Sequence, residues 1–441
     1  MKTSSTLVRK AETLLTPSDR HVLAGIEKTL AKAARVGAEP KRLAVLAFSG
    51  GLDTSFCVPW LRERGWDVVT VLVDTGGFTP EKVREIAKRA KELGARRHFF
   101  VDGRKEIYDR LISHCIRANG TYQQMYPVMC ADRYLIVEKS VELARKVKAE
   151  AVAHGCTGMG NDQARFDVTL RALGCENILA PIRDYQAMGG GPVRDRETKF
   201  LEERGFAVAK KHTRYSINQN VFGVTISGSE IDRREEPAED AWTLTAPPEK
   251  TPARPDRVTI GFEGGLPVSL GGRRMHGIEI LRRLNETAGR HGVGRFLYTG
   301  DCVIGIKGRI AFECPGLHTL LVAHRAIEEA TLSKEQNQFK DVIGRKWTEL
   351  AYNGLFYDPL ARNLEGTLAA MQTHVGGTVT VKLHRGTALP VAYESPYELR
   401  QKGTVYAQTS SWSPDEAAAF VKLYGLSTVM AARRPRPGRS R

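Results

Sequence analysis

The sequence has no Cys-x-x-Cys pair and no apolar run of membrane-spanning length, which would be roughly 18 residues. Its seven cysteines are scattered and odd in number, which argues against a disulfide framework or a zinc ribbon. The first 14 residues lack the apolar core of a signal peptide, and the acidic residues Glu12, Asp19 and Glu27 argue against a transit peptide. We therefore expect a soluble, cytoplasmic protein with no membrane partner.

Aromatic residues are also scarce, at 7% of the chain, and none alternate with the arginines at the C-terminus. The formal net charge is +16, and the last nine residues hold part of it as Arg433, Arg434, Arg436, Arg439 and Arg441. A basic balance suits nucleic-acid binding and enzymes with anionic substrates equally well. Because base-stacking aromatics are missing there, we expect a solvated tail and do not expect nucleic acid as a partner.

A glycine turn follows the first apolar run. Residues 43–48 read Leu-Ala-Val-Leu-Ala-Phe, and residues 49–55 read Ser-Gly-Gly-Leu-Asp-Thr-Ser. The pattern predicts a strand, a tight turn and a helix N-terminus, where amides, hydroxyls and the helix dipole favour a phosphate. Asp53 is suited to orient a hydrated metal ion beside it. The turn lacks a Walker A ending and the third glycine of a dinucleotide fingerprint, so pyrophosphate is the expected ligand. A simple Ser/Gly turn before a helix is the alternative interpretation.

From Lys41 onward, apolar runs alternate with helical stretches. Strands are expected over residues 43–48, 68–74, 98–102 and 151–155, and helices from Asp53, over 80–93, up to Arg117, and over 132–148. This alternation predicts a parallel sheet covered on both faces. Ligands of such sheets bind beyond the carboxyl ends of the strands, where residues 49–55 and 155–163 both lie.

The remainder predicts an α+β domain. Residues 235–256 contain five prolines and predict an exposed connection. Strand pairs are expected over 257–262 and 266–270, turning on Gly264 and Gly265, and over 378–383 and 389–392; helices are expected over 277–285, 318–329, 334–352 and, after a Ser413 cap, 414–423. The predicted division is a basic helical extension (1–40, with a helix over 17–36), a Rossmann-like α/β nucleotide-binding domain (41–205), an α+β substrate domain (206–405) and a C-terminal helix with basic tail (406–441).

A second loop carries polar residues. Residues 155–166 read Gly-Cys-Thr-Gly-Met-Gly-Asn-Asp-Gln-Ala-Arg-Phe. Thr157, Asn161 and Asp162 supply donors and acceptors, and Arg165 follows Asp162 on the same helical face. Such a loop can hold an amino acid zwitterion, with Asp162 facing an ammonium group and Arg165 a carboxylate. A helix-capping turn with Asn161 as its cap is the alternative interpretation.

Together, the two loops resemble the argininosuccinate synthase family. The first loop is shared with several ATP pyrophosphatases of the PP-loop superfamily, whereas Thr-Gly-x-Gly-Asn-Asp is characteristic of this one family. The resemblance runs from Lys41 to Met430 and includes residues 117–119, 215–216, 285–295, 304–307, 349–354 and 394–396. It implies that the ureido oxygen of citrulline attacks the α-phosphorus of ATP, giving citrullyl-AMP and pyrophosphate, and that the amine of aspartate then displaces AMP. It also implies ATP and Mg²⁺ as cofactors, a role in arginine biosynthesis and a homotetramer joined by the C-terminal helix.

The resemblance assigns roles residue by residue. It implies that Asp53, Asp162 and Arg165 are catalytic, that Asp53 holds the metal, and that aspartate meets Thr157, Asn161 and Asp162. The implied ATP contacts are Ala47, Phe48, Ser49, Gly50, Gly51, Leu52, Asp53, Thr54, Ser55, Val73 and Gly155. The implied citrulline contacts are Tyr126, Asn161, Arg165, Ser216 and Thr225, the last in place of a serine.

Three positions differ from the family pattern. A serine expected shortly after Tyr126 is replaced by Cys130 or Ala131, an expected glutamate by Gly300, and an expected tyrosine by Phe312. Asp301 and Ser227 are the candidate replacement contacts. Because unpaired polar ligand atoms are costly, a related aspartate ligase with another ureido or carbonyl acceptor is the first alternative function.

Two further alternatives fit part of the sequence. A tRNA-modifying ATP pyrophosphatase would suit the net charge, but thiolating members of that group generally need paired cysteines, and the Asn161-Asp162 loop would have no role. A binding protein that has lost catalysis and holds nucleic acid by its basic ends is the other. Its intact glycines, hydroxyls and Asp53 argue against that interpretation.

Overall fold

The computed structural model describes residues 42–208 and 214–434, so the helix expected over residues 17–36 lies outside the described residues. The first unit is built on a parallel five-stranded sheet with the order β3-β2-β1-β6-β7. Its strands are β1 (Arg42–Ala47), β2 (Trp66–Asp74), β3 (Arg97–Asp102), β6 (Ala151–Ala153) and β7 (Ile178–Leu179). The predicted parallel sheet is therefore confirmed.

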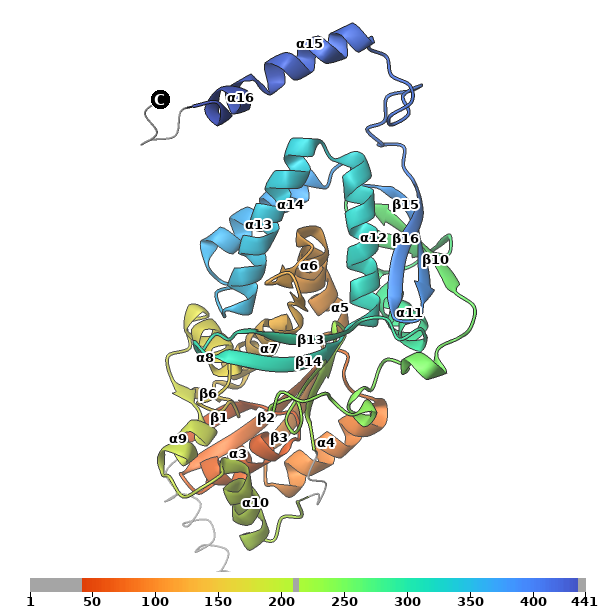
Figure 1. Ribbon diagram of the computed structural model, residues 1–441. Helices are drawn as coiled ribbons and strands as arrows, with labels where there is room; N and C mark the ends of the chain where they lie inside the picture. Colours follow the sequence, from red (N-terminus) through yellow and green to blue (C-terminus); the bar gives the residue numbers. More distant parts are fainter. Residues whose placement is uncertain (1–41, 209–213, 435–441) are drawn as a thin grey trace, which may run out of the picture.

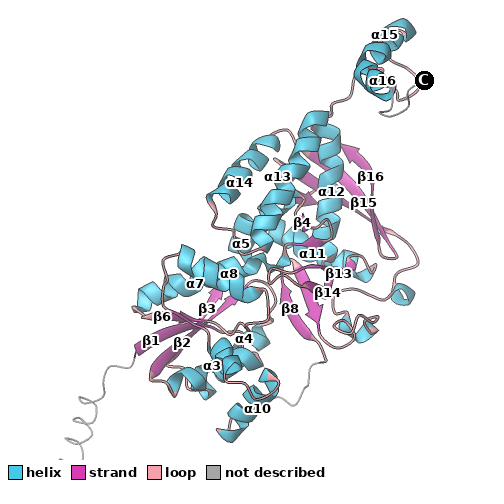
Figure 2. Ribbon diagram, turned by 60° about the vertical axis from the view of Figure 1, so that its left-hand side comes forward, coloured by secondary structure: helices cyan, strands magenta, loops and turns pink. Residues whose placement is uncertain are grey.

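Helices cover both faces of this sheet (Figures 1 and 2). Along β1, Ala44 and Leu46 belong to one buried cluster, whereas Val45 and Ala47 belong to the other, because successive strand residues point to opposite faces. The first face carries α3 (Leu52–Arg62), α4 (Pro80–Glu92), α9 (Pro181–Ala187) and α10 (Val193–Glu203); the second carries α7 (Asp132–Val147) and α8 (Asp162–Ala172). The α/β fold class is confirmed.

The expected helix ending near Arg117 is interrupted. It consists of α5 (Arg104–Ile107), a π-helical turn (Tyr108–Ile112) and α6 (Ser113–Ala118), and Asn119 ends it with a φ of 50°. A short hairpin of β4 (Thr121–Tyr122) and β5 (Tyr126–Pro127) and a 3-10 turn (Met129–Ala131) lead into α7. These short elements lie between the two units of the chain.

The second unit contains an antiparallel sheet with the order β12-β11-β10-β15-β16. Its strands are β10 (Asp256–Glu263), β11 (Leu266–Leu270), β12 (Arg273–Arg274), β15 (Gly377–His384) and β16 (Thr387–Glu394), packed with α11 (Gly277–Arg290), α12 (Pro315–Thr331), α13 (Lys334–Tyr352) and α14 (Pro359–Met371). The predicted hairpin turns at Gly264 and Gly265, whose φ values of 55° and 73° favour glycine. The α+β prediction is confirmed for this unit.

A further four-stranded sheet, with the order β13-β14-β9-β8, was not predicted. Its strands are β13 (Arg295–Asp301), β14 (Lys307–Glu313), β9 (Gly223–Ser227) and β8 (Ser216–Asn220). The turn between β8 and β9 is bound to the first unit, because Val221 N–H donates to the carbonyl of Thr75 at 2.8 Å and Asn220 Nδ2 donates to that of Met129 at 2.9 Å. The sheet therefore contacts the chain directly beyond the carboxyl end of β2.

Residues 235–256 are less exposed than predicted. They form two 3-10 turns (Glu239–Ala241 and Pro248–Lys250), and the buried carboxylate of Glu313 accepts hydrogen bonds from the amides of Thr243, Leu244 and Thr245. A buried carboxylate needs such donors, and this one anchors the connection to β14.

The C-terminal helices α15 (Pro414–Tyr424) and α16 (Leu426–Ala432) lie apart from the rest of the molecule in both views and bury no residue. Ser413 caps α15 as predicted, in a reciprocal capping box with Glu416. Among the described residues, none of the helices combines the length and apolar character that crossing a bilayer requires.

Candidate active site

The first loop joins β1 to the N-terminus of α3. Gly50 has a φ of 75°, and a Cβ there would lie 2.9 Å from Ile86 Cγ1, so both the conformation and the space require glycine. Gly51 is the N-cap residue of α3, and no side chain caps the helix there. The amides at this helix N-terminus are thus available to an anionic ligand.

Hydroxyl groups fix the shape of this loop. Ser49 Oγ lies 3.3 Å from Thr54 Oγ1, and the buried Ser55 hydroxyl donates to the carbonyl of Gly50 at 3.5 Å. Ser49, Gly51, Leu52 and Thr54 remain at least partly exposed. The other expected ATP contacts, Ala47, Phe48 and Val73, are buried in the sheet and its core. Their side chains therefore pack in the core next to the loop and support its backbone.

Asp53, in the first turn of α3, has a buried carboxyl neighbour that sequence reasoning missed. Glu197 of α10 is fully buried, and neither of its oxygens has a hydrogen-bond partner. Burial, and then the negative charge of Asp53, raise the pKa of Glu197 to about 9. The sequence contains one indication that Glu197 is buried: it precedes the core residue Phe200 by about one helical turn.

The residues around Asp53 fit a magnesium ion. Mg²⁺ is commonly held by one or two carboxylates together with substrate phosphates, and here the partly exposed Asp53 stands in the first turn of α3, at the phosphate-type loop. In the described part of the chain, no cluster of three or more metal-binding side chains occurs. Phosphate oxygens and water would therefore supply the remaining ligands.

The second loop touches the first. A Cβ at Gly155 would lie 3.0 Å from Thr54 Cγ2 and 3.4 Å from Thr54 N. Side chains hold this loop in place: Gln186 Oε1 accepts from Gly158 N–H at 2.7 Å, and Gln163 Nε2 donates to the carbonyls of Gly158 and Gly160 at 2.7 and 3.2 Å. Thr157 and Asp162 are half-buried at the two ends of this stretch. Asn161 does not cap α8 through its side chain, which argues against the capping interpretation.

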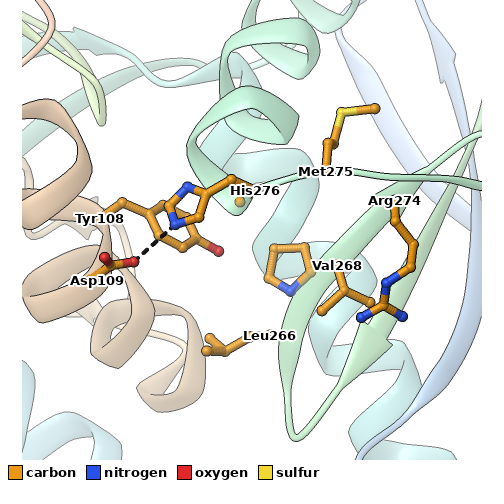
Figure 3. A pocket seen from close by; sticks show the side chains of 9 residues that line it. Tyr108, Asp109, Leu266, Val268, Arg274, Met275 and His276 are labelled. Atoms are coloured by element: carbon orange, nitrogen blue, oxygen red, sulfur yellow. Dashed lines mark hydrogen bonds and ion pairs between the residues drawn. The ribbon is translucent and has the colours of Figure 1, made fainter.

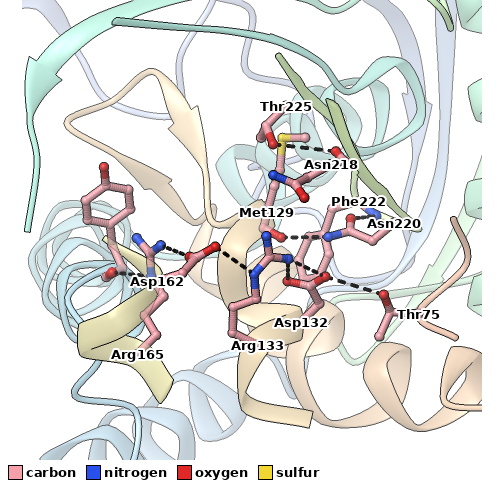
Figure 4. Close-up of polar contacts among 11 residues, drawn as sticks. Thr75, Met129, Asp132, Arg133, Asp162, Arg165, Asn218, Asn220, Phe222 and Thr225 are labelled. Atoms are coloured by element: carbon pink, nitrogen blue, oxygen red, sulfur yellow. Dashed lines mark hydrogen bonds and ion pairs between the residues drawn. The ribbon is translucent and has the colours of Figure 1, made fainter. Parts of the chain in front are cut away.

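Asp162 lies between two arginines (Figure 4). Its carboxylate accepts from Arg165 Nη1 at 2.6 Å and from Arg133 Nε at 3.1 Å. Burial opposes ionisation, but Arg133 and Arg165 outweigh it and lower the pKa of Asp162 to about 2. Arg165 is 3% exposed and also donates to the carbonyl of Tyr352 at 2.9 Å. Asp162 is therefore a fixed negative charge at neutral pH.

Arg133 is a second site residue that the sequence analysis missed. Its Nη1 donates to both oxygens of Asp132, at 2.7 and 2.8 Å, and Thr75 in turn donates to Asp132 at 3.4 Å. This chain of contacts connects the carboxyl end of β2 to Asp162. The adjacent Asp-Arg pair at the start of a predicted helix was its only signal in the sequence.

The expected citrulline contacts meet at an aromatic cluster. The ring of the buried Tyr126 lies 5.0 Å from that of Phe312 and 5.8 Å from that of Tyr352. Arg165 lies 4.9 Å from the centre of the Tyr352 ring, and Asn161 Nδ2 is 3.5 Å from the Tyr352 hydroxyl. Asn161 Oδ1 is buried without a partner, so it is free to accept a hydrogen bond from a ligand.

Strands β8 and β9 bring Thr225 and Ser216 to the same region. Thr225 pairs with Phe312 across the sheet, and its hydroxyl donates to the carbonyl of Asn218 at 3.5 Å (Figure 4). Ser216 pairs with Ser227. Cys130 and Ala131, at the family departure near Tyr126, are both buried.

Position 300 is crowded by the ends of two side chains. A Cβ on Gly300 would overlap the Tyr298 hydroxyl and lie 2.6 Å from Gln123 Oε1. The Tyr298 hydroxyl donates to Gln123 at 2.8 Å, and Gln123 Nε2 donates to Asp301 at 2.7 Å. Asp301 is also paired with Lys307. Its carboxylate is thus already engaged, and its role as a substrate contact stays a prediction.

A separate pocket of about 460 Å³ contains none of the expected site residues (Figure 3). Tyr108, Asp109, Leu266 and His276 are among its lining residues, and His276 Nε2 lies 3.0 Å from Asp109 Oδ1. It belongs to the π-helical turn, β11 and the start of α11. The two loops, rather than this pocket, therefore carry the candidate active site.

The parallel sheet carries a Ser-Gly-Gly turn at the N-terminus of its first helix. A neighbouring loop fixes an acidic residue between two arginines. This arrangement is that of a nucleotide-dependent ligase of the ATP pyrophosphatase class. Sequence models for the arginosuccinate synthase N-terminal HUP domain and C-terminal domain match residues 43–213 and 215–431. The chain belongs to the argininosuccinate synthase family, whose members are ATP-dependent carbon–nitrogen ligases.

Curated relatives agree. Argininosuccinate synthase of Xanthomonas campestris is 48% identical over 388 residues, which are 88% of this chain and 98% of the relative. The Pyrococcus furiosus and Methanocaldococcus jannaschii argininosuccinate synthases are each 40% identical, over 392 and 396 residues; both alignments cover 88% of this chain, and 93% and 98% of the respective relatives.

Proposed function

We propose that the protein joins L-citrulline to L-aspartate at the expense of ATP, forming argininosuccinate, AMP and pyrophosphate in arginine biosynthesis. The contact between Gly155 and Thr54 carries this proposal, because it brings a phosphate-type loop and an amino-acid-type loop into one site. The family membership supports the same reaction.

In the first step, the loop at residues 49–55 holds the departing pyrophosphate. Backbone amides at the N-terminus of α3 and the hydroxyls of Ser49 and Thr54 face the charge that grows on the β-phosphate, which is electrostatic catalysis by preorganised donors. Asp53 would hold Mg²⁺, which when bound neutralises phosphate charge. No protein nucleophile takes part in this step.

In the second step, the loop at residues 155–162 presents the amine of aspartate to the activated carbon. Because the pKa of Asp162 is lowered to about 2 by its arginines, this carboxylate is too weak a base to deprotonate an amine at neutral pH. Asp162 instead orients the amine by hydrogen bonding, and Thr157 and Asn161 Oδ1 add contacts. As the carbon–nitrogen bond forms, the carbon–oxygen bond to AMP breaks, and the protons of the amine pass to water or to the departing phosphate. Orientation of this kind is worth several kcal/mol, or about 7–11 in the best intramolecular cases.

The same proposal includes a role for each part of the chain. Residues 41–205 bind the nucleotide, residues 206–405 complete the acceptor site, and residues 406–441 join subunits into a homotetramer. The exposed apolar side chains of α15 support a role in assembly. A cytoplasmic location suits the seven cysteines, all of which are unpaired.

Half-reactions separate the roles of the two acidic residues. With citrulline and ATP, Asp53→Ala is expected to lose pyrophosphate release, whereas Asp162→Ala should retain adenylation and lose argininosuccinate formation. The exposed Asp195→Ala on α10 is the matched control and should behave as the unsubstituted protein. Undiminished product formation by Asp53→Ala and Asp162→Ala would refute the proposal.

A second candidate is a ligase with the same donor and another ureido or carbonyl acceptor. The departure at position 300 favours it, since Gly300 offers no carboxylate where the family pattern has a glutamate, and Tyr298 and Gln123 occupy the adjacent space. Pyrophosphate release measured over a panel of acceptors distinguishes the two functions. Release with citrulline and aspartate at the highest kcat/KM supports citrulline, and release with another acceptor alone supports the second candidate.

A further inference from the structure

His154 is a buried histidine to which the proposed reaction assigns no role. It follows β6 directly, its side chain is almost completely buried, and its amide donates to the carbonyl of Leu179 at 3.0 Å, continuing the pairing with β7. The next residue, Gly155, contacts Thr54 of the first loop. His154 thus occupies the point where the sheet ends and the two loops begin.

The hydrogen bonds of His154 determine its tautomer. The amide of Cys156 donates to Nδ1 at 3.2 Å, so Nδ1 must carry a lone pair rather than a proton. Nε2 lies 2.8 Å from Asp167 Oδ1 and therefore carries the proton and donates it. The ring is held at both ends, by the backbone of the second loop and by a carboxylate of α8.

Asp167 is itself fixed. Arg183 Nη1 of α9 donates to its other oxygen, Oδ2, at 2.9 Å, and Arg171 Nη1 lies 3.5 Å from the same atom. Burial opposes ionisation of Asp167, but the bonds from His154 and Arg183 lower its pKa to about 2. Asp167 therefore remains an acceptor over the whole physiological pH range.

We propose that His154 and Asp167 are positioning residues that hold the second loop in its working conformation by fixing the Nε2–H tautomer. The Cys156 amide that this tautomer binds lies between Gly155, next to the phosphate-type loop, and Thr157, the expected aspartate contact. Loss of the bond moves Thr157 relative to the first loop. The expected effect on aspartate kinetics rests on the proposed function, whereas the expected effect on the conformation of the second loop does not.

Two substitutions of His154 separate its two bonds. In His154→Asn, the amide oxygen stands near the former Nδ1 and can still accept from Cys156 N–H, whereas Asp167 is out of reach. In His154→Gln, the longer side chain can reach Asp167 but leaves the Cys156 amide without its acceptor. We expect hydrogen–deuterium exchange at Cys156 to stay slow in His154→Asn and to accelerate about tenfold or more in His154→Gln.

The kinetic effects should follow the same order. His154→Gln is expected to lower kcat/KM for aspartate about tenfold or more, because small misplacements of a reacting group are costly. Exchange of pyrophosphate into ATP with citrulline present should change less than about threefold, since the bonds within the first loop do not involve His154. His154→Asn should restore most of the aspartate kinetics.

Asp167→Asn tests the tautomer without changing the histidine. Arg183 requires an acceptor, so the asparagine must direct its oxygen there and its NH₂ group towards Nε2. That arrangement forces the proton to Nδ1, which then cannot accept from Cys156. We expect Asp167→Asn to resemble His154→Gln in both exchange and aspartate kinetics, with a far-ultraviolet circular dichroism spectrum that shows a folded chain.

Three outcomes would overturn the inference: equal exchange at Cys156 in His154→Asn and His154→Gln, normal aspartate kinetics in Asp167→Asn, or a loss confined to pyrophosphate exchange. Failure of the unsubstituted protein to use citrulline and aspartate would refute the proposed function instead. The exchange measurement at Cys156 would still decide the structural claim in that case.

Discussion

At the scale of single residues, two carboxyl groups of the site have opposite environments. Asp162 has two arginine partners and a pKa lowered to about 2, whereas Glu197 has burial and a negative neighbour and a pKa raised to about 9. Because of these environments, Asp162 is permanently charged, whereas Glu197 is protonated at neutral pH. While it holds its proton, Glu197 is uncharged, so its burial needs no counter-ion.

Glu197→Gln should change the pH dependence of stability. The unfolded chain loses this proton near the ordinary value of 4.5, and the folded chain keeps it up to about 9. Between these values the group destabilises the fold increasingly as pH rises, by about 1.4 kcal/mol per pH unit. Glutamine stays neutral in both states, so urea unfolding of the variant without Mg²⁺ or ATP should lack this decline between about pH 6 and pH 8.

The exposed Glu203→Gln on the same helix is the control and should keep the decline. Parallel stability curves for the unsubstituted protein and Glu197→Gln would contradict the assignment of a protonated carboxyl group beside Asp53.

Two glycines offer opposite outcomes for the same change. Gly300→Ala forces its Cβ into the Tyr298 hydroxyl and should destabilise the protein by about 1–3 kcal/mol. Gly366→Ala lies in α14 with no atom near the new Cβ and should stabilise it by about 0.5–1 kcal/mol. Thermal unfolding followed by circular dichroism measures both, and a stable Gly300→Ala would show that the Tyr298–Gln123 contact yields easily.

At the scale of elements, α12 and α13 are joined by a buried ion pair. Lys340 and Glu328 are each 2% exposed, and Lys340 Nζ lies 2.7 Å from Glu328 Oε1. Glu328 also accepts from Asn119 at 2.7 Å and from Gln372 at 2.6 Å, so α6 and the end of α14 join the same network. The carboxylate is thus fully satisfied only when all these elements are packed.

Lys340→Met should therefore cost about 3–5 kcal/mol of unfolding free energy, because it leaves a buried carboxylate without its cation. The matched control is Lys346→Met, which removes an exposed pair with Glu349 on the same helix and should cost less than about 1 kcal/mol. Guanidinium titrations measure both values. A cost below about 1 kcal/mol for Lys340→Met would show that the burial of Glu328 does not depend on this ammonium group.

Elements with strong local signals were predictable from the sequence, and elements defined by distant partners were not. The helix at Lys334–Tyr352 was predicted to the residue, because a Ser333 capping box and an amphipathic pattern delimit it. Strand Ser216–Asn220 was missed because its sequence, Ser-Ile-Asn-Gln-Asn, shows no apolar alternation. This segment is a strand because it pairs with β9.

The candidate site divides in the same way. Both loops were predictable because glycines and polar residues follow apolar strands. Arg133, Glu197 and the pair of His154 and Asp167 were not, because their roles arise from contacts between segments 13 or more residues apart in the sequence. Asp301 was predicted as a substrate contact from the family pattern, but that pattern could not predict its ion pair with Lys307.

At the scale of the whole molecule, the α15–α16 segment is the part that a single chain leaves unpacked. Phe420, Val421, Leu423 and Tyr424 are each more than half exposed. Burying such side chains is worth roughly 1.5–3 kcal/mol each, so an isolated chain leaves considerable free energy unused. The backbone contact of Leu399 with Ala330 is the last hydrogen bond between this region and the α12 helix, before the chain departs from the body.

Truncation after Gly403 tests whether this segment joins subunits. It preserves the Leu399 contact and removes both C-terminal helices, so the rest of the fold should remain intact. We expect light scattering to show a tetramer for the full chain and a smaller species for the truncated one, and the double substitution Phe420→Glu and Tyr424→Glu to act as the truncation does. Substitution of Lys422→Glu on the same helix changes charge without removing apolar area and should leave the tetramer intact. A truncated chain that keeps the tetrameric mass would place the assembly surface elsewhere, and a monomeric full chain would refute the tetramer itself, because the mass can depend on these helices only if their apolar side chains are buried between subunits.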